Sequence, residues 1–286
     1  MIERIWAKPE MHSAIAEARH EGKTIGLVPS MGALHEGHLS LVHAACARTD
    51  FVVVSIFVNP TQFAPGEDFE LYPRDIAADL DLLGADGVAV VFTPSVEGMY
   101  GASAQASVEP GPLASRWEGE IRPGHFGGAA TVVAKLFNIV HPDLAFFGEK
   151  DYQQLRIVQQ MNRDLDLGVG VIGCPIVRDP DGLALSSRNA YLSADDRAAA
   201  LALPEALEAA AQALAWGEHD ARALETAMRD AVARVSGGAV TLDYAAVVDP
   251  GTLEPLVSVD APARALIAGR VGKTRLIDNC ALHPKL

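Results

Sequence analysis

The stretch that decides the fold runs from Thr24 to Val58 and reads TIGLVPSMGALHEGHLSLVHAACARTDFVVVSIFV. It opens with a short apolar run that ends at Pro29, which is typical of a buried strand. Residues 37–49 then show helical periodicity, with apolar side chains gathered on one stripe. Residues 51–58 are β-branched or aromatic at nearly every position, which suits a strand buried on both faces. The order strand, helix, strand predicts a βαβ unit.

The same alternation continues on both sides of this unit. We expect further helices over residues 10–22, 76–83, 131–140 and 152–164, and further strands over residues 88–92, 144–147 and 169–177. This order predicts an α/β fold with a Rossmann-like parallel sheet and helices on both faces. In such sheets a ligand binds beyond the carboxyl ends of the strands, where the strand order reverses.

The pattern changes near residue 177. Residues 194–235 are rich in alanine with helical periodicity, and residues 240–286 hold short apolar runs split by glycine and proline. This change predicts helices followed by a small antiparallel sheet. We therefore expect a Rossmann-like domain over residues 1–176 and a smaller α+β C-terminal domain over residues 177–286.

The composition excludes several classes of protein. The chain has 286 residues, of which 49% are apolar, so it can bury a core and is not disordered in bulk. Its formal net charge of −14 argues against a nucleic-acid partner. The three cysteines are far apart and predict neither a disulfide framework nor a CxxC metal site. We see no secretory signal and no apolar run near the roughly 20 residues that a spanning helix needs, so we expect a cytoplasmic protein without membrane contact.

The first candidate site is PSMGALHEGHLSLV, Pro29–Val42. Gly32 and Gly37 allow close backbone approach, and the N–H groups at the start of the following helix favour an anion. His35 and His38 stand at this helix start, where imidazoles can donate hydrogen bonds to phosphate as charge builds on a leaving group. Two alternatives stay open. The pair could bind zinc, although no third ligand stands out, or it could cap the helix and pack.

A second candidate site is SIFVNPTQF, Ser55–Phe63, at the end of a predicted buried strand. Asn59 and Gln62 carry neutral amides that both donate and accept hydrogen bonds. Such groups suit a hydroxy-acid substrate that needs orientation without a full ion pair. The alternative is a plain turn, because Asn-Pro is a common turn dipeptide.

A third segment, FFGEKDYQQ at Phe146–Gln154, again leads from a strand end into a helix. Lys150 is placed where a lysine could clamp phosphate, and Asp151 where a carboxylate could hold a ribose hydroxyl or a cation. Gln154 follows Lys150 by one helical turn. A charged helix start, stabilised by the helix dipole, would explain the same residues without a ligand.

Two loops complete the candidates. VRDPDGLALSSRNAYLS at Val177–Ser193 gathers Ser186, Ser187 and Arg188, a set that can bind a polyphosphate or can serve as a polar linker with a helix cap. Its place at the domain boundary would suit a mobile flap. GEIRPGHFGG at Gly119–Gly128 holds Arg122 and His125 in a loop that could lie near the site or be a plain connection.

Together these segments resemble the pantothenate synthetases, also called pantoate–β-alanine ligases, over nearly the whole chain. The resemblance rests on PSMGALHEGHLSLV, SIFVNPTQF, FFGEKDYQQ and DGLALSSRN occurring in this order. It implies a member of the nucleotidyltransferase superfamily that joins (R)-pantoate to β-alanine and splits ATP into AMP and pyrophosphate. Pantoate would first form pantoyl adenylate, and the amine of β-alanine would then expel AMP.

The resemblance also implies roles for single residues. Residues 1–176 would bind nucleotide and pantoate, and residues 177–286 would form a lid. The catalytic groups would be His35, His38, Lys150, Ser186, Ser187 and Arg188. The ATP site would comprise Pro29, Met31, Gly32, Ala33, Leu34, His35, Glu36, Gly37, His38, Gly148, Glu149, Lys150, Asp151, Val177, Leu185, Ser186, Ser187 and Arg188. The substrate pocket would comprise Gln62 for both pantoate and β-alanine, Gln154 for pantoate, and Asn59, Tyr72 and Arg122.

His38 matches the position that acts as proton donor in this family. Because expelled pyrophosphate barely needs a proton near neutral pH, we expect His38 to stabilise the transition state by hydrogen bonding. Mg²⁺ would bind mainly to the phosphates of ATP, with Asp79 as a candidate protein ligand. The family resemblance also implies a homodimer. The alternative functions are a nucleotidyltransferase for another acid or a phosphorylated acceptor, and a nucleotide-binding regulatory module without chemistry.

Overall fold

The computed structural model describes residues 2–64, 67, 69, 70, 72–84 and 87–284. The chain forms two compact units. Unit 1 comprises Met1–Glu149 and Gln153–Pro175, and unit 2 comprises Lys150–Tyr152 and Ile176–Leu286. The separate tasks that the sequence suggests for the two parts of the chain stay predictions.

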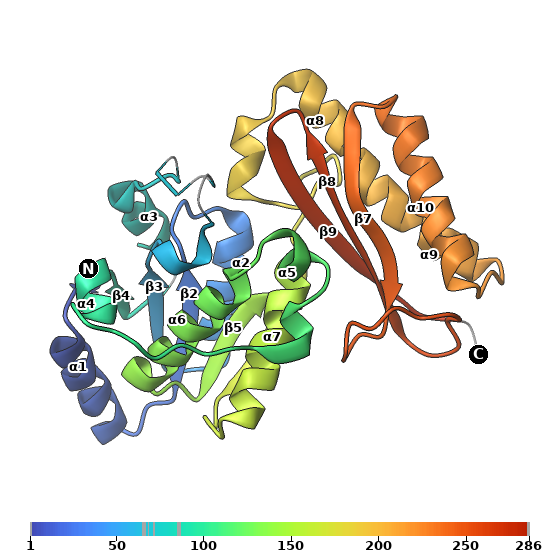
Figure 1. Ribbon diagram of the computed structural model, residues 1–286. Coiled ribbons are helices and arrows are strands. Elements are labelled where there is room, and N and C mark those ends of the chain that lie inside the picture. Colours follow the sequence, from blue (N-terminus) through green and yellow to red (C-terminus); the bar gives the residue numbers. More distant parts are fainter. Residues whose placement is uncertain (1, 65–66, 68, 71, 85–86, 285–286) are drawn as a thin grey trace. The chain divides into compact units, whose positions relative to one another are not determined.

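Unit 1 is built on a parallel sheet (Figure 1). Within the described residues its strands are β1 (Glu3–Ile5), β2 (Ile25–Ser30), β3 (Phe51–Ile56), β4 (Val90–Phe92), β5 (Leu144–Gly148) and β6 (Gly170–Cys174). They lie in the order β1-β4-β3-β2-β5-β6, and each neighbouring pair is parallel. This confirms the α/β fold expected from the alternating strands and helices.

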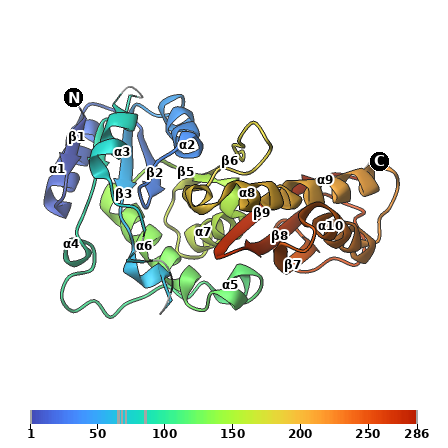
Figure 2. The ribbon, with the colours of Figure 1, turned by 90° about the horizontal axis from the view of Figure 1, so that it is seen from above.

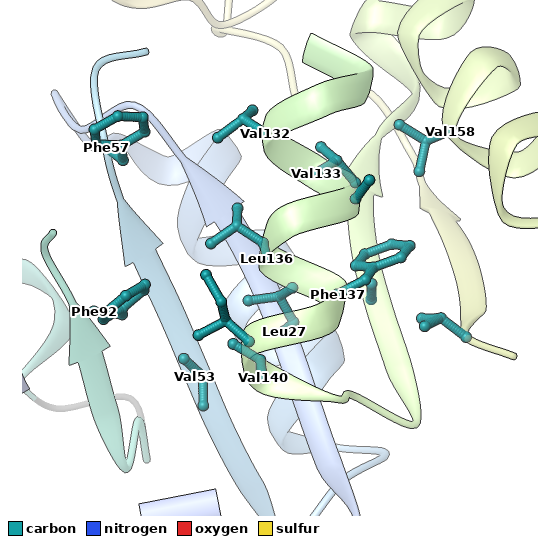
Figure 3. Close-up of a cluster of buried hydrophobic side chains, with 14 of the residues drawn as sticks. Leu27, Val53, Phe57, Phe92, Val132, Val133, Leu136, Phe137, Val140 and Val158 are labelled. Atoms are coloured by element: carbon teal, nitrogen blue, oxygen red, sulfur yellow. The ribbon is translucent and has the colours of Figure 1, made fainter. Parts of the chain in front are cut away.

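Helices cover both faces of this sheet. The described helices of three or more turns are α1 (Lys8–His20), α2 (Glu36–Cys46), α6 (His125–Val140) and α7 (Tyr152–Asp164). The first residue of α7 belongs to unit 2. The shorter helices are α3 (Ile76–Leu83), α4 (Val96–Tyr100), α5 (Glu118–Ile121) and the 3₁₀ turns η1 (Pro60–Gln62), η2 (Gly111–Ala114) and η3 (Glu149–Asp151). Successive strand side chains point to opposite faces. Leu27 and Val53 therefore pack beneath Leu136 and Val140 of α6 (Figure 3). Val28 joins the separate core beneath α2, which lies across β2 and β3 from α6 (Figure 2).

The strand order reverses beside β2. The chain moves outward from β2 to β3 and β4, and then returns to place β5 on the other side of β2. The carboxyl ends of β2 and β5 therefore meet at a topological switch point, where parallel sheets bind ligands. Pro29–Val42 begins at one of these ends and Gly148 lies at the other.

Unit 2 is α+β, as the sequence predicts. Its described strands are β7 (Val240–Val248), β8 (Ala263–Val271) and β9 (Thr274–Leu282), antiparallel in the order β7-β8-β9. Its helices are α8 (Ala194–Ala200), α9 (Ala202–Ala215) and α10 (Ala221–Ser236), preceded by the 3₁₀ turn η4 (Ser187–Tyr191). Helices α9 and α10 pack side by side on one face of the sheet (Figure 1). Alternate residues of β8, such as Ala265 and Ile267, form a core with these helices.

Several boundaries differ from the sequence predictions. Helix α6 begins at His125 instead of residue 131, because Gly127 and Gly128 pack inside a helix although glycine lowers helix propensity. The three-residue strand β1 was not predicted, since it is too short to show a period.

Within the part of the chain that the structure describes, no helix is both long and apolar enough to cross a membrane.

Candidate functional site

The first motif forms a braced turn between β2 and α2. Gly32 has a φ of 88°, and Ala33 has a φ of 53°, so both lie in the left-handed region. The carboxylate of Asp79 on α3 accepts hydrogen bonds from the backbone N–H of Leu34 at 2.8 Å and of Ala33 at 3.2 Å. A Cβ atom at Gly32 would lie only 2.9 Å from the Asp79 Oδ2 atom. The motif therefore needs a glycine at this position both for its backbone angle and for the close approach of Asp79.

The two histidines of this motif are oriented by backbone N–H groups. The Nδ1 atom of His35 accepts from the N–H of Gly37 at 3.1 Å, and the Nδ1 atom of His38 accepts from the N–H of His35 at 3.3 Å. Because an accepting Nδ1 carries no proton, each neutral ring must carry its proton on Nε2. The ring centroids lie 4.1 Å apart. The pair thus caps α2, as one alternative proposed, and also bears two Nε2–H donors suited to phosphate oxygens.

Asp79 has a structural task that sequence reasoning did not foresee. Its side chain is buried at 3% exposure, and burial raises the pKa of this carboxyl above its usual value, against the two backbone N–H donors that lower it. Among the described residues, no group of three or more His, Cys, Asp or Glu side chains could hold a metal ion. The expected role of Asp79 as a Mg²⁺ ligand stays a prediction.

Asn59 and Gln62 form a hydrogen-bonded pair at the end of β3. Asn59 is fully buried, and its Nδ2 atom donates to the side-chain Oε1 of Gln62 at 3.0 Å. Backbone groups fix which way the Asn59 amide points. The N–H of Thr61 donates to Oδ1 at 3.3 Å, and the carbonyl of Gly128 accepts from Nδ2 at 3.1 Å. Gln62 must therefore turn its oxygen toward Asn59, and its Nε2 has no hydrogen-bond partner among the described residues.

Tyr100 completes this network, although the sequence analysis did not select it. Its hydroxyl donates to Asn59 Oδ1 at 2.7 Å, and burial raises the pKa of Tyr100, which keeps the hydroxyl protonated. Gly128 on α6 allows the helix to approach the turn η1, because a Cβ atom there would lie 2.2 Å from the carbonyl oxygen of Thr61. The turn interpretation is thus correct for Asn59, and the same turn sets the orientation of Gln62.

Arg122 and His125 support Gln62 from its backbone side. Arg122 makes a two-bond ion pair with Glu67, with Nε to Oε1 at 2.8 Å and Nη2 to Oε2 at 2.9 Å. This guanidinium holds the pKa of Glu67 below its usual value. Arg122 Nη1 lies 3.1 Å from His125 Nε2, and an arginine can only donate. The proton of His125 is therefore on Nδ1, which donates to the backbone carbonyl of Gln62 at 2.8 Å.

Burial lowers the pKa of His125 to about 4, and the nearby charge of Arg122 acts in the same direction. His125 is therefore neutral near pH 7. The expected substrate contact of Arg122 stays a prediction, and the structure shows this guanidinium already neutralised by Glu67.

The remaining predicted pocket residues, Tyr72 and Gln154, belong to unit 1. Tyr72 is buried and packs edge-on against Phe63, with ring centroids 6.1 Å apart. Gln154 is half-buried on α7. Its neighbour Gln153 is buried and is hydrogen-bonded to the loop before α5, with Nε2 donating to the carbonyls of Leu113 and Arg116 at 2.7 and 2.9 Å. Gln153 therefore holds the segment before α5, and the expected pantoate contact of Gln154 stays a prediction.

Lys150 and Asp151 belong to unit 2, although they follow directly on Gly148 and Glu149 of unit 1. The Lys150 Nζ atom lies 3.6 Å from Asp151 Oδ1. The backbone carbonyl of Lys150 accepts a hydrogen bond of 2.9 Å from Asn279 Nδ2 on β9. Lys150 is thus anchored through its backbone carbonyl.

The fourth segment is a small hairpin within unit 2. The N–H of Leu185 donates to the carbonyl of Val177 at 3.0 Å, and Arg178 bridges to Ala184. Ser186 then caps η4 by accepting from the N–H of Arg188 at 3.3 Å. The predicted set Ser186, Ser187 and Arg188 therefore lies in one continuous turn, as its adjacency in sequence requires, and this turn packs beside β9.

Comparisons with known proteins identify the family. The pantoate-beta-alanine ligase pattern matches residues 4–281. The chain belongs to this family. A pantothenate synthetase from Rubrobacter xylanophilus is 58% identical over 272 residues, which are 92% of this chain and 93% of that one. The crystal structure of the pantothenate synthetase from Thermus thermophilus has a TM-score of 0.94 at 46% identity, covering 99% of this chain and 100% of that one.

A third relative was solved with ligands. The pantoate-beta-alanine ligase from Francisella tularensis, described as complexed with β-γ ATP and β-alanine, has a TM-score of 0.79 and 34% identity. The match covers 98% of this chain and 97% of that one. The family resemblance noted from the sequence motifs is thereby confirmed.

Sequence reasoning missed the residues that support the motifs. Tyr100, Glu67, Asp278 and Asn279 lie far along the chain from the segments they contact. None directly follows a strand of the parallel sheet, and Asp278 and Asn279 lie inside β9. Only an alignment of many family members could have singled them out beforehand.

Proposed function

We propose that this chain condenses (R)-pantoate with β-alanine and splits ATP into AMP and pyrophosphate. The match of the pantoate-beta-alanine ligase family to residues 4–281 carries this conclusion. The site geometry supports it, because phosphate donors and neutral amides stand at the carboxyl ends of neighbouring strands. The enzyme is accordingly a carbon–nitrogen ligase.

In the first step, a carboxylate oxygen of pantoate attacks the α-phosphorus of ATP. An O–P bond forms, the bond from the α-phosphorus to the bridging oxygen breaks, and pyrophosphate leaves. We propose that the Nε2–H groups of His35 and His38 donate to the phosphate oxygens as charge builds there. Lys150 and the Ser186–Arg188 turn would bind the same polyphosphate through charge-assisted hydrogen bonds.

The acid is held, we propose, by donors from Gln62 and Gln154. Gln62 offers an Nε2–H₂ group and not an oxygen, since its Oε1 accepts from Asn59. It therefore suits the carboxylate or hydroxyl oxygens of pantoate. Asn59 acts through Gln62, because its own amide is buried and hydrogen-bonded on both sides.

In the second step, the amine of β-alanine attacks the activated carbonyl carbon. A C–N bond forms, the C–O bond to AMP breaks, and the amine loses its protons to solvent. The mixed anhydride is needed because a free carboxylate is a poor acyl donor. The neutral environment near Gln62 fits this step, since the pKa of His125 of about 4 leaves no imidazolium there near pH 7.

Some features of this family remain proposals for this chain. We propose that Mg²⁺ enters on the phosphates of ATP, whose charge it offsets. We also propose a homodimer, which analytical ultracentrifugation would test, and action in the cytoplasm. A role of residues 177–286 as a lid is likewise a proposal.

Isotope exchange tests the proposed function. Labelled pyrophosphate should enter ATP when pantoate is present and β-alanine is absent, because adenylation is reversible. Adding β-alanine should then yield pantothenate and AMP in equal amounts. Exchange that another hydroxy acid supports better than pantoate would instead favour the alternative nucleotidyltransferase. No exchange and no turnover with any acid would favour a non-catalytic nucleotide-binding module.

A further inference from the structure

Two consecutive residues of β9, Asp278 and Asn279, hold the two segments of unit 2 that are predicted to bind phosphate. Both side chains are buried, at 4% and 2% exposure. Because successive strand residues point to opposite faces, the two side chains meet different segments. A buried acid and a buried amide also need satisfied hydrogen bonds, so their partners are held firmly.

Asn279 holds the Lys150 segment. Its Nδ2 atom donates to the Lys150 carbonyl at 2.9 Å. Its Oδ1 atom accepts from the guanidinium of Arg264, with Nε at 2.7 Å. The same guanidinium lies over the ring of Tyr152, 4.1 Å from its centroid, and the Tyr152 hydroxyl donates to the carbonyl of Pro250 at 3.0 Å.

Three groups of unit 2 therefore contact the short segment Lys150–Tyr152, namely the side chains of Asn279 and Arg264 and the carbonyl of Pro250. The Arg264 guanidinium fixes the orientation of the Asn279 amide, because arginine can only donate and must therefore face the amide oxygen. The Nδ2 of Asn279 must then face the Lys150 carbonyl. The backbone of Lys150 is thus positioned by β9 and not only by the start of α7.

Asp278 holds the other segment. Arg178 donates to it with two bonds, Nη1 to Oδ2 at 2.6 Å and Nη2 to Oδ1 at 2.9 Å. The Nη1 atom also donates to the carbonyl of Gly182 at 3.1 Å. This arginine lies in the Val177–Leu185 hairpin that leads into Ser186. Two parallel bonds between arginine and a carboxylate fix orientation as well as distance.

We propose that Asp278 and Asn279 are positioning residues that set Lys150 and the Ser186–Arg188 turn in one fixed arrangement for the phosphates of ATP. The pair links the two segments through a single strand: Asn279 acts on the Lys150 backbone, and Asp278 acts on the hairpin before Ser186. This inference rests on the proposed function, in which those segments bind ATP. It gives the C-terminal sheet a positioning role in adenylation.

The test is pyrophosphate–ATP exchange with pantoate, measured on purified full-length variants. Asn279→Asp keeps an acceptor for Arg264 but turns an oxygen toward the Lys150 carbonyl. It should raise the KM for ATP about tenfold, the cost of replacing a hydrogen bond by a repulsive contact, and leave the KM for pantoate within about twofold. Asp278→Asn, which removes the charge facing Arg178, should shift the KM for ATP in the same direction.

The matched control is Asp243→Asn. Asp243 on β7 pairs with Arg275 on β9 at 2.6 Å, so this variant breaks an ion pair in the same sheet that includes no residue of either segment. It should leave both KM values unchanged. Wild-type exchange with pantoate tests the proposed function separately, so a failure of the variants alone would count against the positioning pair.

A double variant separates positioning from general destabilisation. If Asn279 acts through Lys150, Asn279→Asp should add less than about twofold to the defect of Lys150→Ala, because coupled residues are not additive. Full additivity, an unchanged KM for ATP, or equal rises in both KM values would overturn the proposal. If Asn279→Asp does not fold, as judged by thermal unfolding, Asn279→Ser replaces it with the same expected pattern.

Discussion

Gln62 owes its hydrogen-bonding polarity to Asn59. The Asn59 amide cannot flip, because Thr61 N–H must meet an oxygen and the Gly128 carbonyl must meet an N–H₂ group. The Gln62 amide is thereby oriented with its oxygen toward Asn59 and its N–H₂ group on the other side. This orientation would let Gln62 select oxygen acceptors such as a carboxylate or hydroxyl.

Isosteric substitution tests this polarity. Gln62→Glu replaces the Nε2 donor by an oxygen and also opposes a negative charge to the pantoate carboxylate. We expect its kcat/KM for pantoate to fall by about 100-fold or more, while the KM for ATP stays within about twofold. Tyr100→Phe removes only the hydroxyl behind Asn59, so it should lower kcat/KM for pantoate by about three- to tenfold. A larger loss from Tyr100→Phe than from Gln62→Glu would contradict this order.

His125 links the same network to pH. Its pKa is about 4 in the folded protein, below the ordinary value near 6.5. As the pH falls from about 6.5 towards 4, His125 is protonated in the unfolded chain but stays neutral in the folded protein. The folded protein is therefore destabilised on acidification. Between about pH 7 and pH 5, the free energy of unfolding should fall by roughly 2 kcal/mol because of His125.

The measurement is the free energy of unfolding in urea at both pH values. His125→Asn keeps an amide donor near the Gln62 carbonyl but has no titrating ring. Its loss of stability on acidification should be smaller than that of the wild type by roughly 2 kcal/mol. Equal losses in the two proteins would show that folding does not lower the pKa of His125, and that the folded protein takes up this proton as readily as the unfolded chain.

At the scale of elements, the turn Pro29–His38 depends on a helix that lies far along the chain. Asp79 on α3 supplies both acceptors for the N–H groups of Ala33 and Leu34. Asp79→Asn leaves one of these N–H groups facing an amide N–H₂. We expect a loss of about 1–3 kcal/mol in stability and a higher KM for ATP.

Asp75→Asn is the control for this variant. Asp75 caps α3 through the N–H of Ala78, and asparagine caps helices about as well as aspartate. This variant removes a neighbouring charge without removing a brace, so its stability and KM should stay near those of the wild type. If Asp79→Asn changed the Mg²⁺ dependence and left stability intact, Asp79 would be a metal ligand and not a brace.

The elements that could be predicted are those in which apolar residues recur with a clear helical or strand periodicity. The helices Ile76–Leu83 and Tyr152–Asp164 match the expected ranges, and the strand at Phe51 shows itself by β-branched residues. The alanine-rich stretch predicted helix but not its breaks near Leu201 and Trp216, because alanine suits a helix at any position.

The candidate site was predictable only where chemistry stands at a strand end. His35, Gln62 and Lys150 follow strands closely, so sequence order alone indicated them. Their supports Asp79, Tyr100 and Asn279 reach the same segments across 41 to 129 positions of sequence. Such contacts depend on the tertiary fold, which no local pattern encodes.

At the scale of the whole molecule, the chain holds separate apolar cores in its two units. The cores of unit 1 draw on the parallel sheet and its helices, and that of unit 2 on β7–β9 with α9 and α10. The segment Lys150–Tyr152 belongs to unit 2 although it lies between two parts of unit 1 in the sequence. A predicted phosphate-binding lysine therefore depends on the stability of the C-terminal unit.

Matched core substitutions test whether each unit unfolds on its own. Leu136→Ala in α6 and Leu203→Ala in α9 each remove a buried leucine, at a cost of about 2–5 kcal/mol. We expect urea unfolding in two steps, with each variant shifting one step, because chains of several units depart from two-state behaviour. Pyrophosphate exchange should disappear together with the step that Leu203→Ala shifts, since Lys150 loses the Asn279 anchor when unit 2 unfolds. A single transition that both variants shift equally would instead make the chain one cooperative unit, in which Lys150 is no more dependent on unit 2 than on unit 1.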